Sequence, residues 1–505
     1  MAVNQLKAGA ILSYILLGLN TVIGLLYTPF LLRMLGKSEY GLYSLAASVI
    51  AYLTVFDLGF GNAIIRYTAK FRAEGKQKEQ YEMFGMFFLL YLAISLIAFI
   101  VAIVLVCNVN VIFNASMTIQ EVTRMRIILL LMAFNMAFTF PMSIWGSIIT
   151  AYEDFIFQKL VNIARTILNP LVMVIFLLLG YKAIALVVVT TIFNVLTLSI
   201  NYFYCKQKLH IKLYFRKFKW NFLREVSVYS FWIFLNVIMD RIYWSSGQFI
   251  LGIYKGTASV AVYAVAIQLK DMFFMFSTAI SSVFLPRVTS MVAKGVPDKE
   301  ISDLFIRTGR IQYIVMAFIL VAFILFGKSF ISLWAGFSYL EAYKIALLFF
   351  VPVTIPLIQN IGVTILMARN QMKFRCILYV IIAIGSLFLA IPLAKLYGGI
   401  GCAFATALAL VLGQVIIMNI YYKRIIHLDI SLFWQEIGKM SIAPFVIGAV
   451  GYLILSRIKI DNVSTFLMSS LIFSAVYFIV IWQISMNSYE RNLFKAPLLK
   501  FISKL

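Results

Sequence analysis

Long uninterrupted apolar runs, which recur from one end of the sequence to the other, constrain the fold more than any other feature. The run MFFLLYLAISLIAFIVAIVLVC at residues 86–107 contains no charged residue, and its polar and apolar positions do not alternate. A helix of about twenty such residues crosses the hydrocarbon core of a bilayer, whereas the strands of a membrane barrel alternate. We therefore expect an all-α polytopic membrane protein. The composition agrees, since 63% of the residues are hydrophobic and only 12% are charged.

Hydropathy along the chain predicts about fourteen transmembrane helices. Their expected ranges are 10–32, 40–65, 83–107, 126–150, 161–180, 183–204, 226–251, 258–285, 311–334, 343–367, 376–396, 399–422, 438–456 and 463–484. If the N-terminus is cytoplasmic, most Lys and Arg residues of the loops and tails lie on the cytoplasmic side. The positive-inside rule therefore predicts a multi-pass protein with both termini in the cytoplasm. The net charge of +24 is explained in this way and indicates no nucleic-acid partner.

The two halves of the chain resemble each other at an offset of about 215 to 221 residues. The matching positions are Tyr43 with Tyr263, Arg66 with Arg287, Thr139-Phe-Pro141 with Thr354-Ile-Pro356, and NYFYCKQKLH at 201–210 with NIYYKRIIH at 419–427. The pattern predicts two repeats of six helices. Because six is even, both repeats enter the membrane in the same direction and are related by a pseudo-twofold axis along the membrane normal.

This duplication predicts the domain organisation. An N-terminal lobe of helices 1–6 spans residues 1–210, and a C-terminal lobe of helices 7–12 spans 226–425, followed by helices 13–14 and a cytoplasmic tail at 426–505. The basic linker at 211–225 lies within CKQKLHIKLYFRKFKWNFLREV (205–226), where cations are interleaved with aromatic residues. That composition favours an interfacial helix on the anionic inner leaflet, with a solvated loop as the alternative.

Two charged couples interrupt consecutive apolar segments. Asp240 and Arg241 lie near the middle of FLNVIMDRIYWSSGQFILG (234–252), and Lys270 and Asp271 reach a similar depth in the next helix. A charge at that depth costs at least about 2.5–3.5 kcal/mol, so it needs a partner or a water-filled cavity. Neighbours on a helix point about 100° apart, so we do not expect pairing within a couple. The couples either form ion pairs with each other, or direct at least one cation toward an anionic substrate.

The first half of the chain offers a sparser set of polar candidates, namely Asn20, Asp57, Arg66 and Arg165. Arg66 and Arg165 lie toward the inner ends of their spans, where a long side chain can also extend to the lipid headgroups. Asp57 is too short to do so. It is followed by two glycines within four residues, which permit a close helix approach or a local break. We therefore expect Asp57 at a cavity or a hinge.

The sequence indicates no cofactor, metal site or catalytic residue. The four cysteines and two histidines show no metal-ligand spacing. Two GKS tripeptides lack the first glycine of a phosphate-binding loop, because Leu31 and Ala322 stand in its place. No loop is large enough for a catalytic domain. These features favour a transporter over an enzyme.

Several of these segments together resemble a known family. They are YGLYSLAASVIAYLTVFDLGFGNAIIR (40–66), the Asp240–Arg241 couple with GQFILGIYKGTASVAVYAVA (247–266), the fourteen expected helices and the duplication. The chain resembles, over essentially its whole length, the polysaccharide-synthesis branch of the multidrug/oligosaccharidyl-lipid/polysaccharide (MOP) exporter superfamily. The resemblance implies a V-shaped pair of lobes, a central cavity lined by helices 1, 2, 7 and 8, and alternating access.

The resemblance also implies a function. Such a protein would be a flippase in the bacterial inner membrane that moves undecaprenyl-pyrophosphate-linked oligosaccharide to the outer leaflet, for assembly of lipopolysaccharide O-antigen, capsule or exopolysaccharide. Arg241 and Lys270 would then bind the pyrophosphate or an acidic sugar, and Asp240 and Asp271 would orient them. The expected partners are the lipid-linked glycan and anionic membrane lipids, with the monomer as the functional unit. Because no ATPase is encoded, a proton or sodium gradient, the membrane potential or downstream consumption of the product must supply the direction of transport.

Two alternatives are open at this point. A cation-coupled multidrug exporter of the same superfamily would have a predominantly acidic cavity, whereas here cations accompany the acids. A membrane enzyme of glycan assembly would carry a sizeable loop with paired carboxylates.

Overall fold

The computed structural model describes residues 5–215, 220–458, 460, 462–493 and 495, and this part of the chain is almost entirely helical and contains no strand. Within it, eleven helical stretches are long and apolar enough to cross a membrane. Two of them, Ile11–Ala73 with 63 residues and Met372–Arg424 with 53, are each longer than two spans require. The all-α polytopic membrane fold is confirmed, while the number of spans and the duplication stay predictions.

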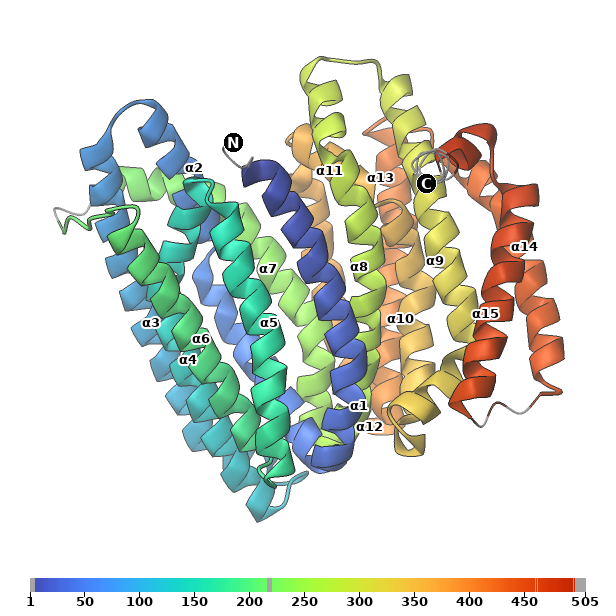
Figure 1. Cartoon of the computed structure of the whole chain (residues 1–505), viewed down its shortest axis with the longest axis horizontal. Coiled ribbons are helices and arrows are strands. Elements are labelled where there is room, and N and C mark those ends of the chain that lie inside the picture. Colours follow the sequence, from blue (N-terminus) through green and yellow to red (C-terminus); the bar gives the residue numbers. More distant parts are fainter. Residues whose placement is uncertain (1–4, 216–219, 459, 461, 494, 496–505) are drawn as a thin grey trace, which may run out of the picture. The chain divides into compact units, whose positions relative to one another are not determined.

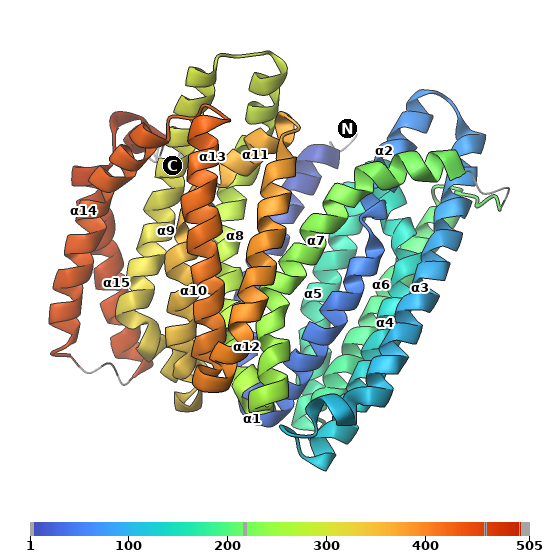
Figure 2. The same cartoon turned by 180° about the vertical axis from the view of Figure 1, so that it is seen from behind.

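The helices pack into two compact units, of which unit 1 comprises residues 1–264 and 394–399. Its elements are α1 (Gln5–Leu53), η1 (Thr54–Asp57), α2 (Phe60–Ala73), α3 (Gln77–Phe113), α4 (Ile119–Ala151), α5 (Phe155–Leu178), α6 (Ala183–Gln207), α7 (Trp220–Lys255) and the start of α8 (Thr257–Ala293). Helix α4 packs between α3 and α6, and α1 packs along both α5 and α7 (Figures 1 and 2). The core around Phe60, Phe87, Tyr91 and Trp145 joins α2, α3 and α4.

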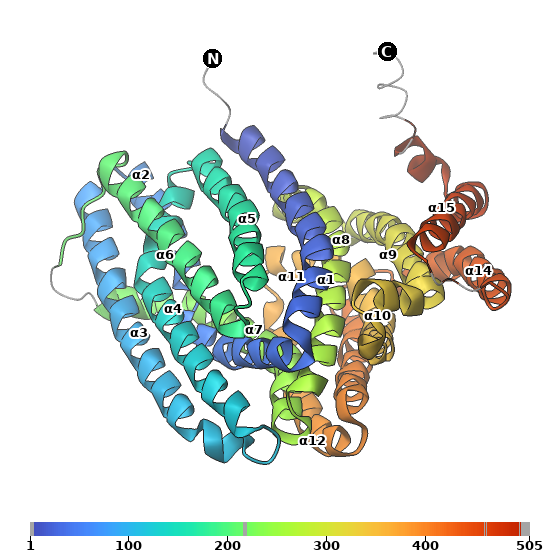
Figure 3. The same ribbon diagram turned by 60° about the horizontal axis from the view of Figure 1, so that its bottom comes forward.

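Unit 2 comprises residues 265–393 and 400–505. Its elements after α8 are α9 (Asp298–Trp334), η2 (Phe337–Tyr339), α10 (Glu341–Ile358), α11 (Asn360–Ala368), α12 (Met372–Leu410), the π-helical η3 (Val411–Ile417), α13 (Met418–Arg424), α14 (Ile430–Leu455), α15 (Val463–Val480) and the π-helical η4 (Ile481–Ser485). Helix α9 packs against α10, α14 and α15 (Figure 3). Phe318 on α9 stacks on Phe473 and contacts Tyr477 of α15, which fixes the last helix pair to its unit.

The division between the units differs from the predicted linker at 211–225. Helix α7, which the duplication assigns to the second lobe, packs with α1, α2 and η1 in unit 1. The two-lobe boundary therefore remains a prediction from the repeat.

Glycine and left-handed residues mark the helix breaks. Gly36 (φ 72°) lies at a kink within α1, and Gly398 (φ 59°) lies at one within α12. The predicted helix over 40–65 is interrupted, because Leu58 and Gly59 adopt φ values of 53° and 71° directly after Asp57. The Thr54 hydroxyl donates to the Ala51 carbonyl at 2.7 Å, which satisfies a backbone acceptor beside this break. Of the close helix approach and the local break that the glycines after Asp57 permit, the structure shows the break.

The predicted interfacial helix over 205–226 is wrong for residues 210–215, which are not helical. This segment instead runs along α3, where the Tyr214 N–H donates to the Tyr81 carbonyl at 3.2 Å and the Tyr81 hydroxyl donates to the His210 carbonyl at 3.4 Å. Its aromatic side chains also contact the protein, since Tyr214 packs on the Tyr81 ring. Hydrogen bonding to α3 therefore replaces the helix. Residues 216–219 of the predicted linker and 496–505 of the predicted tail lie outside the described residues.

Glycines of the segments that carry the family resemblance lie where helices of unit 1 approach closely. A side chain at Gly41 would collide with the Thr257 carbonyl at the start of α8, and one at Gly252 of α7 would collide with Leu45 of α1. The Ser116 hydroxyl also donates to the Gly252 carbonyl at 2.6 Å. Small residues allow this backbone contact, which explains why the resemblance consists of packing patterns and not of catalytic motifs.

We predict that Gly41→Ala destabilises unit 1 by about 1–3 kcal/mol, because the added methyl group requires the start of α8 to move. The measurement is the thermal unfolding midpoint of the full chain in detergent. Gly18→Ala is the matched control on the same helix, since a methyl group added there would find open space within 4 Å. An unchanged midpoint for Gly41→Ala would show that the close approach is not required.

Candidate functional site

The predicted site residues belong to both units. Asn20, Asp57, Arg66, Arg165, Asp240 and Arg241 lie in unit 1, and Lys270 and Asp271 lie in unit 2.

Arg165 is the charged end of a polar network inside the helices of unit 1. Its Nη1 donates to Asn194 Oδ1 at 3.1 Å, and Asn194 Nδ2 donates at 2.7 Å to both Asn135 Oδ1 and Thr139 Oγ1. The network joins α5, α6 and α4 and contains no carboxylate. In the described part of the chain Arg165 forms no ion pair, so its positive charge is oriented by amides and is not neutralised.

The sequence analysis did not identify the residues that hold Arg165. Asn135 and Asn194 lie in largely apolar helices without a charged residue beside them, and Thr139 served only as a marker of the repeat. An amide within a membrane helix is a weak signal by itself, since it also stabilises helix packing. Two asparagines and a threonine placed together on two neighbouring helices would have been a stronger signal.

Arg241 on α7 retains unsatisfied donors. Its Nε is buried without a hydrogen-bond partner, and within the described part of unit 1 the side chain forms neither a hydrogen bond nor an ion pair. The adjacent Asp240 is exposed. A buried guanidinium nitrogen without a partner is costly, and the guanidinium presents a fork of donors that matches carboxylate or phosphate oxygens. Arg241 is therefore suited to bind an anion.

Lys270 is neutralised within its own couple, contrary to the sequence expectation. Its Nζ lies 2.6 Å from Asp271 Oδ1 and 4.9 Å from the Phe274 ring centroid. The Lys270 side chain is buried, whereas that of Asp271 is 61% exposed. The expectation failed because it considered only the directions in which side chains leave the helix. The four-carbon chain of lysine is long enough to bend back to its neighbour.

The remaining predicted residues have dissimilar surroundings. Asp57 lies at the end of η1 beside the fully buried Tyr91, whose hydroxyl also faces Ser143. In the part of the chain that the structure describes, that hydroxyl has no hydrogen-bond partner of ordinary geometry. Arg66 is exposed on α2, with its guanidinium carbon 5.8 Å from the Tyr67 ring centroid, and Asn20 is exposed on α1. Among the described residues, no group of three His, Cys, Asp or Glu could hold a metal ion.

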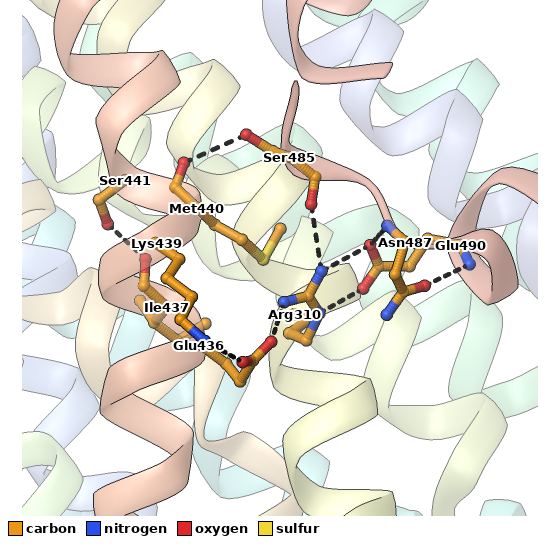
Figure 4. A network of polar contacts seen from close by, with 9 residues as sticks. All are labelled: Arg310, Glu436, Ile437, Lys439, Met440, Ser441, Ser485, Asn487 and Glu490. Atoms are coloured by element: carbon orange, nitrogen blue, oxygen red, sulfur yellow. Dashed lines mark hydrogen bonds and ion pairs between the residues drawn. The ribbon is translucent and has the colours of Figure 1, made fainter. Parts of the chain in front are cut away.

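Unit 2 contains a charged cluster that the sequence analysis missed (Figure 4). Arg310 on α9 donates to both carboxylate oxygens of Glu490, at 2.6 and 3.0 Å, and to Glu436 of α14 at 2.5 Å. A further bond of 3.1 Å reaches the Ser485 carbonyl at the end of η4. Because the guanidinium is almost saturated, this cluster joins three segments and offers no open binding site. In the sequence, Arg310 resembles an ordinary charge beside a span.

We predict that Arg310→Gln lowers the thermal unfolding midpoint in detergent and the membrane abundance, because it leaves two carboxylates without their cation, at a cost of about 3–5 kcal/mol. Adding Glu490→Gln should recover part of the loss. Arg307→Gln, which removes an exposed charge from the same helix, is the control. Equal midpoints for Arg310→Gln and Arg307→Gln would refute a structural role for the cluster.

Comparison with known proteins places these helices in a family. A family model described as "Polysaccharide biosynthesis protein" matches residues 6–292, more than half of the chain. The chain belongs to this family. No curated protein sequence matches it.

Solved structures of transporters share the fold of this family member. The lipid II flippase MurJ in an inward closed conformation matches with a TM-score of 0.72 and 19% identity, covering 97% of this chain and 99% of that one. An inward-facing multidrug resistance MATE transporter of the MOP superfamily matches with a TM-score of 0.62 and 14% identity, covering 83% and 95%. A MOP-superfamily transporter from Pyrococcus furiosus, described as having a binding pocket of reverse polarity, matches with a TM-score of 0.56 and 14% identity, covering 81% of this chain and 94% of that one. The matches are to transporters and flippases, not enzymes. At these identities they show the fold alone.

Proposed function

We propose that the protein is a flippase that moves undecaprenyl-pyrophosphate-linked oligosaccharide from the inner to the outer leaflet of the bacterial cytoplasmic membrane. The glycan would serve O-antigen, capsule or exopolysaccharide assembly. Membership of the polysaccharide biosynthesis family and a fold similar to that of a lipid flippase support the proposal. Transport would proceed by alternating access between two lobes with both termini in the cytoplasm.

The observation that carries the proposal is the unpaired guanidinium of Arg241. In the described residues of unit 1, nothing neutralises it or binds its buried Nε. A pyrophosphate would supply several anionic acceptors, and its charge-assisted hydrogen bonds would offset the cost of holding Arg241 in an apolar segment. A substrate with the opposite charge would increase that cost.

Arg165 is proposed as a second substrate cation, because its neutral anchor leaves its charge available. Lys270 is given a lesser role than the sequence suggested, since Asp271 already accompanies it. Asp57, at a helix break, is proposed to take part in the conformational change. A proton or sodium gradient would drive transport, and the monomer would be the functional unit.

A cation-coupled multidrug exporter is the second candidate, and similarity to a MATE transporter fold is the observation that favours it. Its cationic substrates would need carboxylates without partners. Arg165 and Arg241 present the opposite polarity, which favours the flippase.

We predict that Arg241→Gln reduces delivery of lipid-linked glycan to the outer face at least about tenfold, the equivalent of one lost charge-assisted contact, whereas Arg241→Lys retains part of it. The measurement is the amount of lipid-linked glycan accessible on the outer face of cells that depend on this protein, at matched membrane abundance. Lys328→Gln on α9 is the control. Equal transport by the Gln and Lys variants would mean that the charge of Arg241 is not used.

We also predict that Asp57→Ala impairs delivery more than Arg66→Ala. Asp57 lies at the break between η1 and α2 beside a buried tyrosine, whereas Arg66 is exposed and can extend toward the headgroups. The same accessibility assay compares the two variants. If both transport equally well at the same abundance, Asp57 has no special part in the cycle.

A further inference from the structure

A second amphipathic site lies at one end of unit 1. A cavity of about 500 Å³ is formed by the end of α5, the α5–α6 turn and the start of α6, together with residues of α1 and α4. In Figure 1 this turn lies at the same end of unit 1 as the kink of α1. The volume falls within the range of about 300–1,000 Å³ that is typical of small-molecule sites.

The polar end of the cavity is built around a buried carboxylate. Glu39 accepts a hydrogen bond from Arg124 Nη1 and another, at 3.3 Å, from the Ala183 N–H. These contacts fix the orientation of Arg124, whose side chain is still 37% exposed. Glu39 therefore positions a cation that keeps donors available on its open side.

Lys182 adds a second cation at the same end. It lines the cavity from the α5–α6 turn and is exposed. Its ammonium forms no ion pair or hydrogen bond in the described part of the chain. Glu39 offsets one of the two positive charges, so the cavity as a whole carries a net charge of about +1 and favours an anion.

The wall of the cavity is apolar and open to its surroundings. Phe176 of α5 and Val188 of α6 line it, with 37% and 36% of their surfaces exposed. Cations at the helix ends next to apolar residues along the helices match the arrangement of a lipid, whose phosphate lies at the interface and whose chains extend inward. A free phosphate would use only the polar end.

We propose that this cavity binds an anionic phospholipid, with the phosphate on Lys182 and Arg124 and the first part of an acyl chain against Phe176 and Val188. The site uses none of the residues assigned to transport. It stands whether or not the proposed flippase activity holds.

The test uses the purified full chain and phosphatidylglycerol with a photoreactive diazirine in its acyl chain. After irradiation, mass spectrometry of peptides measures labelling within residues 176–189. We expect labelling that unlabelled phosphatidylglycerol displaces. Lys182→Gln should weaken the apparent affinity about tenfold, and Val188→Trp, which fills the cavity, should abolish labelling. Lys78→Gln, the same change at an exposed lysine of α3 in unit 1, should label like the wild type.

Other lipids and a soluble anion identify what is recognised. Photoreactive phosphatidylcholine with the same chains should label residues 176–189 much less. Equal labelling by phosphatidylcholine and phosphatidylglycerol would overturn the proposal, because the cavity would then accept any lipid chain. Displacement by soluble glycerol phosphate at concentrations similar to those of the lipid would also overturn it, because the site would bind phosphate without a lipid. If Lys182→Gln is labelled as strongly as the wild type, Lys182 does not bind the phosphate as proposed.

Discussion

The hydrocarbon core of the bilayer offers no hydrogen bonds, and the structure depends on this constraint. Each backbone polar group must find a partner within the protein, which explains why the described residues are helical almost throughout. The constraint also limits where a helix can break. Beside the interruption at Asp57 a threonine hydroxyl satisfies a carbonyl, and Ser277 donates at 2.8 Å to the Leu357 carbonyl near the end of α10. Irregular backbone persists where side chains supply these bonds.

The same constraint distinguishes three arginines, of which Arg310 is buried and Arg165 and Arg241 are partly exposed. Arg310 binds two carboxylates and a carbonyl and thereby holds three segments of unit 2 together. Arg165 is held by a neutral amide, and Arg241 has no described partner. Because all three carry the same charge, the difference lies in what the neighbouring helices supply. Cations with neutral or absent partners are therefore better candidates for binding an anion than the fully paired one.

The sequence predicted the helical membrane fold well, because apolar runs of about twenty residues have few other interpretations. The glycines after Asp57 permitted either a close helix approach or a local break, and only the structure distinguishes the two. The sequence could not predict the partners of Arg165 or Arg310, because Asn194, Glu436 and Glu490 are brought to them only by helix packing. The prediction of an interfacial helix over 205–226 was wrong for a related reason. Tyr81, which holds residues 210–215 in a nonhelical conformation, is more than a hundred residues away in the sequence. Long-range contacts of this kind leave no local pattern.

The pairing of Lys270 with Asp271 affects the work needed to move α8. Both charges belong to the same turn of one helix, so a shift or rotation of that helix carries cation and anion together. An ion pair between two helices has to be broken when they separate, at an electrostatic cost that rises as the surroundings become less polar. A pair within one helix avoids that barrier. The Lys270–Asp271 pair can thus move between more and less polar surroundings at membrane depth without its two charges being separated.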